Sequence, residues 1–157
     1  MNLRKPLTIL ATAAALGLVA CGGDDESSGL SKADLAKQAD VICQTAKTAS
    51  LKITAPADFG QPTSDPAEAA AYLEKIAPIT RKEATDLKAL EPADDVKADW
   101  DAFTAKESEL ADFLDGLLAK AKAKDESGLK DLERVPQLGA EFSAAATKIG
   151  ASGCAKG

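Results

Sequence analysis

Hydrophobic residues recur at spacings of three and four along most of the chain, which is the period of one face of an α-helix. The first such stripe begins after Ser31, a residue suited to capping a helix, and predicts a helix at about 32–53. Its members are Leu35, Ala39, Ile42, Ala46, Ala49 and Ile53. No stretch sustains the apolar–polar alternation of a strand. The pattern therefore predicts an all-α protein.

Three further stripes predict helices at about 66–90, 93–124 and 129–150. Asp65 followed by proline marks the start of the second helix. Pro78 lies inside it and predicts a kink or a split, because proline lacks an N–H and crowds the preceding turn. Four helices with short connections favour an up-down-up-down bundle with crossing angles near about 20°.

The first 20 residues follow a different pattern. Arg4 and Lys5 precede an uninterrupted, mainly apolar run from Leu7 to Ala20. At about 1.5 Å per residue this run reaches roughly 21 Å, which is short of the ~30 Å hydrocarbon core of a bilayer. We therefore expect residues 1–20 to be a cleaved export signal rather than a spanning helix.

The signal ends at Leu18-Val19-Ala20-Cys21. These residues resemble the lipobox of bacterial lipoproteins, in which leucine and small residues precede an invariant cysteine. The resemblance implies a diacylglyceryl group on the sulfur of Cys21, cleavage before it, and a durable anchor of two or three acyl chains, such as palmitate. An ordinary secretory signal with an incidental cysteine and an N-terminal apolar helix are the alternatives.

The lipobox resemblance also implies a location. Residues 21–30 become the lipidated cysteine and a flexible tether, and 31–157 become one helical domain close to the bilayer. The protein is then extracytoplasmic, on the outer face of the cell membrane or, in a two-membrane envelope, at the outer membrane. The residue after Cys21 is Gly22 rather than Asp. In a two-membrane envelope this resembles the pattern of lipoproteins that are exported onward to the outer membrane.

Charge and composition narrow the partners. Removal of the two basic residues at positions 4 and 5 takes the formal net charge from -6 to -8, which argues against nucleic acid and anionic head groups as partners. Such acidity is also a common solubility feature. The chain has no His and so lacks the usual general base near pH 7 and the commonest transition-metal ligand. We predict no cofactor, no metal site and no catalytic residue, although carboxylate chemistry stays open.

Cys43 and Cys154 are the cysteines that remain once Cys21 is lipidated. Exported compartments permit disulfides, so we predict a bond between them; the alternative is two independent thiols. Cys43 falls about 18 Å along the first helix, whereas Cys154 follows the last helix. The tail must therefore double back, or the last helix must end partway along the first. Gly150 and Gly153 permit such a return.

Two carboxylates lie on apolar stripes. Glu107 falls on the stripe of the third helix, and Glu83 on that of the second. Two inward carboxylates can bind a cation or act as an acid–base pair, and oxygen ligands suit hard cations such as calcium, but the chain has no calcium-loop pattern. From sequence alone we favour the alternative that both lie at the edge of the seam, partly solvated or paired with Lys.

A second group of carboxylates crowds the start of the third helix. It consists of Asp94, Asp95, Asp99 and Asp101, beside Trp100. This group is either an acidic contact patch or, more commonly, a solvated helix face, and Trp100 is more commonly a core residue than a ligand platform. No Gly-rich phosphate loop, nucleophile elbow or Cys-His arrangement occurs in the sequence.

Two short segments carry a broader resemblance. Val-Ile-Cys at 41–43 and Gly-Ala-Ser-Gly-Cys at 150–154 are similar to small Ala-rich lipoproteins of uncharacterised function, which carry one cysteine in the first helix and one close to the C-terminus. We therefore expect a lipid-anchored, non-enzymatic envelope protein that binds another protein or a small ligand. A carboxylate-dependent enzyme and a purely structural surface protein are the alternatives.

Overall fold

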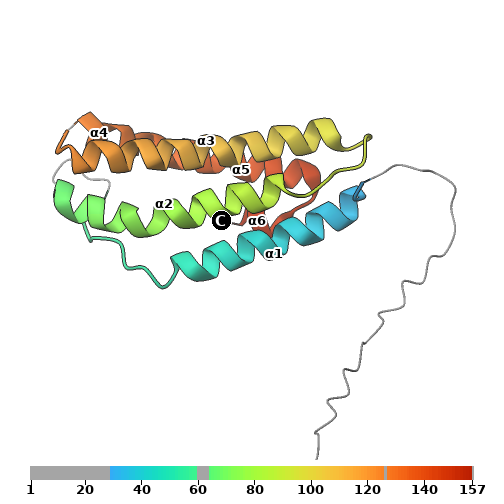
Figure 1. The fold of residues 1–157 in the computed structure, drawn as a ribbon, viewed down its shortest axis with the longest axis horizontal. Coiled ribbons are helices and arrows are strands. Elements are labelled where there is room, and N and C mark those ends of the chain that lie inside the picture. Colours follow the sequence, from blue (N-terminus) through green and yellow to red (C-terminus); the bar gives the residue numbers. More distant parts are fainter. Residues whose placement is uncertain (1–28, 60–63, 126, 157) are drawn as a thin grey trace, which may run out of the picture.

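Long helices lying side by side make up the domain (Figure 1). The computed structural model describes residues 29–59, 64–125 and 127–156; the predicted signal and Cys21 lie outside these ranges. The elements are α1 (Lys32–Ser50), α2 (Pro66–Lys88), α3 (Lys97–Lys122), α4 (Ser127–Asp131), the 3-10 turn η1 (Leu132–Arg134), α5 (Val135–Ile149) and α6 (Ser152–Ala155). The described ranges contain helices and one isolated bridge, between Leu30 and Pro92, and no strand. The all-α prediction is confirmed.

The N-terminal ends of α1 and α2 are capped by the residues that the sequence suggests. Ser31 caps α1, and its hydroxyl accepts from the N–H of Asp34. Asp65 caps α2, and its carboxylate accepts from the N–H of Ala67 at 2.7 Å. These side chains satisfy N–H groups that have no partner within the helix.

The third helix starts later than predicted. Residues 94–96 form a turn, and α3 begins at Lys97 rather than near 93. The N–H of Ala93 donates to the carbonyl of Leu30 at 3.0 Å, and the N–H of Leu30 donates to the carbonyl of Glu91 at 2.7 Å. This pairing with the segment before α1 holds the backbone extended where a helix was expected.

Pro78 does not split the second helix, because α2 is continuous from Pro66 to Lys88. Pro78 and Glu74, whose carbonyl loses its donor, are both exposed. Water can therefore satisfy that carbonyl, while the buried face of α2 keeps its regular spacing.

The prediction of one helix at 129–150 is wrong. The segment is divided into α4, η1 and α5, and α6 follows. Pro136 lies in the first turn of α5, where proline is tolerated, so a new helix begins there. Gly150 ends α5 in the left-handed conformation with φ 86°, and the N–H of Ala151 donates to the carbonyl of Ala146. This turn reverses the chain toward α1.

The returning segment is fixed to α1 by a capping carboxylate and a disulfide. The N–H groups of Gly153 and Cys154 donate to Oδ1 of Asp40 at 2.7 and 3.3 Å. A Cβ at Gly153 would lie 2.9 Å from Cγ of Asp40, so this close approach requires glycine. The Cα atoms of Cys43 and Cys154 lie 5.2 Å apart, and their sulfurs are bonded at 2.03 Å.

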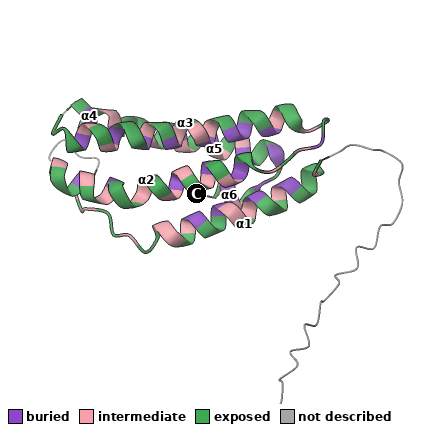
Figure 2. Ribbon diagram, viewed as in Figure 1, coloured by how far each residue is buried: buried purple, intermediate pink, exposed green. Residues whose placement is uncertain are grey.

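Buried apolar residues form two clusters along the helices. Figure 2 marks the buried positions in purple. The aromatic core consists of Leu35, Ala39, Cys43, Leu87, Trp100, Phe103, Phe142, Ala146, Ile149, Ala151 and Cys154. The leucine core consists of Leu73, Ala77, Leu114, Leu117, Ala121 and Leu132. Three buried residues of α1, Leu35, Ala39 and Cys43, belong to the aromatic core, whereas the leucine core is built from α2, α3 and η1.

Candidate functional site

Polar side chains separate the two cores at the middle of α2 and α3. Thr80 and Glu83 lie on α2, after its last leucine-core residue and before its aromatic-core residue. Glu107 takes the corresponding place on α3. We call these three residues the polar layer. Both apolar stripes are interrupted at the same level because the layer crosses from one helix to its neighbour.

Glu107 is the most unusual side chain of the described domain. It is 1% exposed, and its Oε1 atom has no hydrogen-bond partner within the described part of the chain. The expectation that it lies at the solvated edge of the seam or pairs with Lys is therefore wrong. A stripe position shows which helix face a residue occupies, but the depth of that face depends on the helices that cover it. Here α3 packs against both α2 and α5.

The environment keeps both carboxyls of the layer partly protonated near neutral pH. Burial raises the pKa of Glu107 to about 7. Burial, and then repulsion by Glu107, raise the pKa of Glu83 to about 8. Glu83 is only partly buried and has no ion pair within the described ranges. Both pKa shifts show that a charge in this layer lacks compensation.

A cleft with a volume of about 510 Å³ opens onto the polar layer. Residues from α1, α2, α3, α5 and α6 line it, together with the loop after α1. Its apolar walls include Leu51, Ile53, Leu110 and Phe142, and its polar lining includes Lys47, Tyr72, Thr80, Glu83, Glu107 and Ser143. This volume lies within the range of about 300–1,000 Å³ that is usual for small-molecule sites.

The early end of α1 contributes to this opening. The helix stops at Ser50 rather than near 53, and the loop after it carries Leu51 and Ile53 along the wall of the cleft. The disulfide between Cys43 and Cys154 forms another part of the wall. The predicted cysteine pair therefore lies at the cleft, beside the two carboxylates, although no sequence pattern linked these features.

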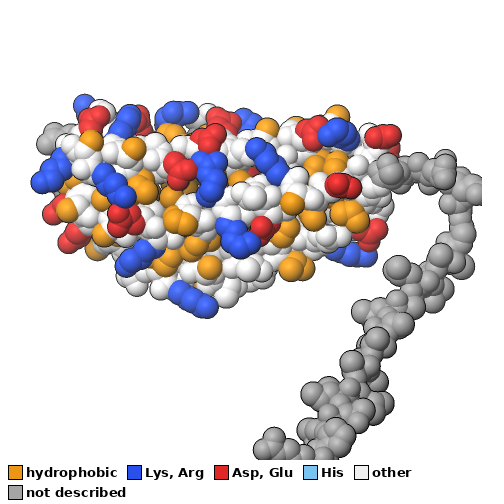
Figure 3. All heavy atoms as spheres, viewed as in Figure 1, with side chains coloured by type: hydrophobic (Ala, Val, Ile, Leu, Met, Phe, Trp, Pro, Cys, Tyr) orange, Lys and Arg blue, Asp and Glu red, His pale blue; other side chains and the backbone are white. Residues whose placement is uncertain are grey.

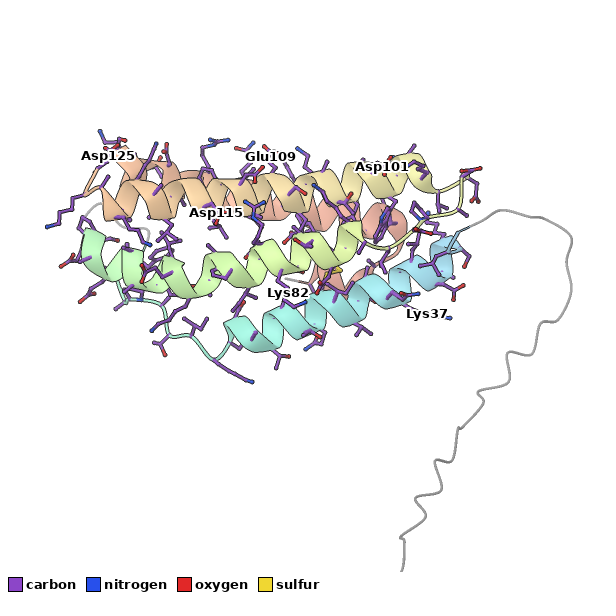
Figure 4. The ribbon with its side chains drawn as sticks, viewed as in Figure 1. Lys37, Lys82, Asp101, Glu109, Asp115 and Asp125 are labelled. Atoms are coloured by element: carbon purple, nitrogen blue, oxygen red, sulfur yellow. A yellow bond between two sulfur atoms is a disulfide. The ribbon has the colours of Figure 1, made fainter. Side chains whose placement is uncertain are left out.

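The acidic group at the start of α3 is a solvated surface. Asp99 pairs with Lys148 at 2.7 Å, and Asp101 pairs with Lys97 at 3.1 Å. Figure 4 shows Asp101 and Glu109 on the outer side of α3. On the face drawn in Figure 3, acidic and basic side chains are intermixed. Trp100 is buried in the aromatic core, 5.3 Å from Phe103 between ring centroids.

The sequence pattern does not identify several residues of the cleft, among them Lys47, Tyr72 and Gly139. Lys47 and Tyr72 lie off the main apolar stripes, and in the sequence Gly139 only interrupts the last helix. A Cβ at Gly139 would meet no atom within 4 Å. One sequence signal could have located the cleft: Glu83 and Glu107 interrupt the apolar stripes of two neighbouring helices at the same level.

The described residues contain no cluster of three or more His, Cys, Asp or Glu side chains able to hold a metal ion. In the same part of the chain, no helix combines the length and the apolarity needed to cross a bilayer. No protein-family model matches the sequence, and neither a curated protein nor a solved structure is significantly similar to it.

Proposed function

We propose that this chain is an extracytoplasmic lipoprotein, anchored through Cys21, whose domain binds a small ligand in the cleft without transforming it. The resemblance at 18–21 supports the anchor. Burial of Oε1 of Glu107 without a partner carries the proposal of ligand binding. An unsatisfied buried polar group destabilises a fold by about 1–3 kcal/mol, and an apolar residue would avoid this loss. A ligand that supplies the missing partner gives such a group a function.

The arrangement of the helices suits this function. We propose that α1, α2, α3 and the composite segment α4–α5 alternate in direction as a four-helix bundle. The short connections between α2 and α3 and between α3 and α4 support this topology. Bundles commonly build ligand sites from side chains on facing helices, as the polar layer would here.

A substitution at the predicted lipidation site tests the anchor. We expect Cys21→Ser to leave the precursor uncleaved and without lipid, because only a thiolate sulfur can take the diacylglyceryl group. Mass spectrometry of the membrane fraction measures both properties. Normally processed and acylated mutant protein would exclude the lipobox interpretation.

Native mass spectrometry of the full-length protein, purified gently from envelopes of cells that produce it, tests the ligand. We expect a bound small molecule in the wild-type protein and none in Gly139→Leu, because that side chain extends into the cleft. Gly116→Leu is the matched control: Gly116 is also helical, a Cβ there would likewise meet no atom within 4 Å, and the residue does not line the cleft. Loss of the ligand from both variants would contradict the assignment to this cleft.

A carboxylate-dependent enzyme is the second candidate. The raised pKa values of Glu83 and Glu107 favour it, since protons that exchange near neutral pH suit acid–base catalysis. The released molecule distinguishes the two functions. A ligand recovered chemically unchanged after incubation with the protein supports binding alone, whereas conversion that is lost in Glu83→Gln supports an enzyme.

A further inference from the structure

We infer that the cleft takes an organic cation, a primary or secondary ammonium on an apolar body, whose N–H groups donate to Glu107 and Glu83. The inference rests on the proposed ligand-binding function and specifies its chemical class. It depends on the orphaned oxygen, on the charges that face the cleft, and on the walls around it.

The orphaned oxygen selects a donor. Oε1 of Glu107 is buried and lacks a partner within the described residues, and Glu107 lines the cleft. An ionised carboxylate only accepts hydrogen bonds, so its complement must carry an N–H or O–H. A donor that is also positively charged forms the stronger bond. A quaternary ammonium carries the charge but has no N–H, so it cannot satisfy this oxygen.

The charges around the cleft favour a cation over an anion. The titratable residues in its lining are Lys47 from α1, Tyr72 and Glu83 from α2, and Glu107 from α3. The residues that α5 and α6 contribute, such as Ser143 and the disulfide-bonded Cys154, carry no titrating charge. Two acids therefore face one lysine. Lys47 is half-buried and has no ion pair within the described ranges, so it does not neutralise Glu83 or Glu107 by direct pairing. Both carboxyls are therefore free to receive another cation.

The remaining walls favour an organic cation over a bare metal ion. Leu51, Ile53, Leu110 and Phe142 present carbon surface, which suits the apolar body of a ligand. Tyr72, whose ring lies 4.6 Å from that of Phe59, adds an aromatic edge. Calcium takes about six to eight oxygen ligands, and the described part of the chain has no group of three or more His, Cys, Asp or Glu side chains placed to hold a metal ion.

Proton release should accompany binding. Without ligand, the pKa of Glu107 is about 7 and that of Glu83 about 8, so both hold protons near neutral pH. An ammonium binds the ionised carboxylates better and therefore displaces these protons. Affinity should rise as the pH rises through 7 and 8, and then fall as the amine itself loses its proton near about pH 10.

Calorimetry with three matched probes tests the inference: cyclohexylammonium, cyclohexyltrimethylammonium and cyclohexanol. The full-length protein is titrated in nanodiscs, with empty nanodiscs subtracted. At pH 8.5 we expect cyclohexylammonium to bind about tenfold to a hundredfold more tightly than either other probe, because only it makes a charged hydrogen bond. We also expect its affinity to rise roughly tenfold between pH 6.5 and 8.5 and its heat to vary with the buffer, since protons are released.

Variants assign the preference to the proposed atoms. Glu107→Gln keeps the volume but cannot ionise, so it should reduce the preference for cyclohexylammonium and flatten the pH dependence. Circular dichroism checks that the variant remains folded. Gly139→Leu should block all three probes, whereas Gly116→Leu should bind them like the wild type.

Each failure has a distinct meaning. Equal affinity for cyclohexanol would overturn the cation inference and leave the ligand cleft intact. Equal affinity for the trimethylated probe would overturn N–H donation. If calcium chloride displaced cyclohexylammonium in a competition titration, the cleft would be a metal site and the inference would be wrong. If no probe binds and the protein from envelopes carries no small molecule, both this inference and the proposed function are wrong.

Discussion

The two cores differ in how they are held together. The aromatic core joins α1, α2, α3, α5 and α6, contains three aromatic side chains, and is closed by the bond between Cys43 and Cys154. The leucine core draws its buried residues from α2, α3 and η1 and contains no cross-link. The polar layer lies where the two meet. The aromatic core is cross-linked, whereas the leucine core draws its buried residues from fewer elements. This difference explains how the domain holds a buried carboxyl beside an open cleft.

Of the changes that test this difference between the cores, loss of the disulfide should lower stability the most. The bond closes a loop with a sequence separation of 111, for which chain entropy predicts a contribution of about 4.7 kcal/mol. We expect Cys43→Ala and Cys154→Ala each to lower the melting temperature by roughly 10–20 °C. Reduction should lower it similarly in the wild type and change neither variant further. Two free thiols in the protein purified without reductant would refute the cross-link.

Truncation of one buried side chain in each core should then test whether the cross-link stabilises only the aromatic core. We expect Phe103→Ala to lose about 3–5 kcal/mol and Leu117→Ala about 2–5 kcal/mol, because both side chains are buried. Combined with Cys43→Ala, the Phe103 substitution should deviate from additivity by more than about 0.5 kcal/mol, since both residues share the aromatic core. Leu117→Ala should be additive. Urea unfolding measures these energies, and identical coupling for both would show that the cores act as one unit.

The polar layer should lower stability as the pH rises. Burial raises the pKa of Glu107 from 4.5 to about 7, so the folded state favours its protonated form. The free energy of unfolding therefore falls as the pH rises between these two values. The loss is on the order of 3 kcal/mol. We expect Glu107→Leu to be more stable than the wild type at pH 8 and to gain less at pH 4. Urea unfolding at both pH values checks this, and a variant that is less stable at pH 8 would contradict it.

Surface ion pairs should have the smallest effect. Arg81 bridges α2 to Asp112, at 2.7 Å, and to Asp115 on α3. These side chains are substantially exposed, and exposed pairs contribute at most about 1 kcal/mol. We expect Arg81→Ala to lose less than about 1 kcal/mol, with the effect reduced further in 1 M salt. Lys82→Ala, which removes a pair within α2, is the control. A loss comparable to that of Leu117→Ala would show that the ion pairs hold the two helices together.

The sequence by itself determined the helical class, the faces of the long helices and the residues that cap α1 and α2. Periodicity and capping are local properties, and the stripes of α2 and α3 already contained Glu83 and Glu107. The lipobox resemblance at Cys21 likewise depends on adjacent residues alone and stays a prediction.

Only the tertiary structure decided how deep those carboxyls lie and what opens beside them. Burial of Glu107 depends on the helices packed around it, and the cleft depends on where α1 stops and where the tail returns after Gly150. The division of the last predicted helix also escaped the pattern, because a restart at Pro136 preserves much of the apolar spacing. A stripe indicates which face of a helix is covered, but desolvation and charge compensation arise from neighbours distant in the sequence.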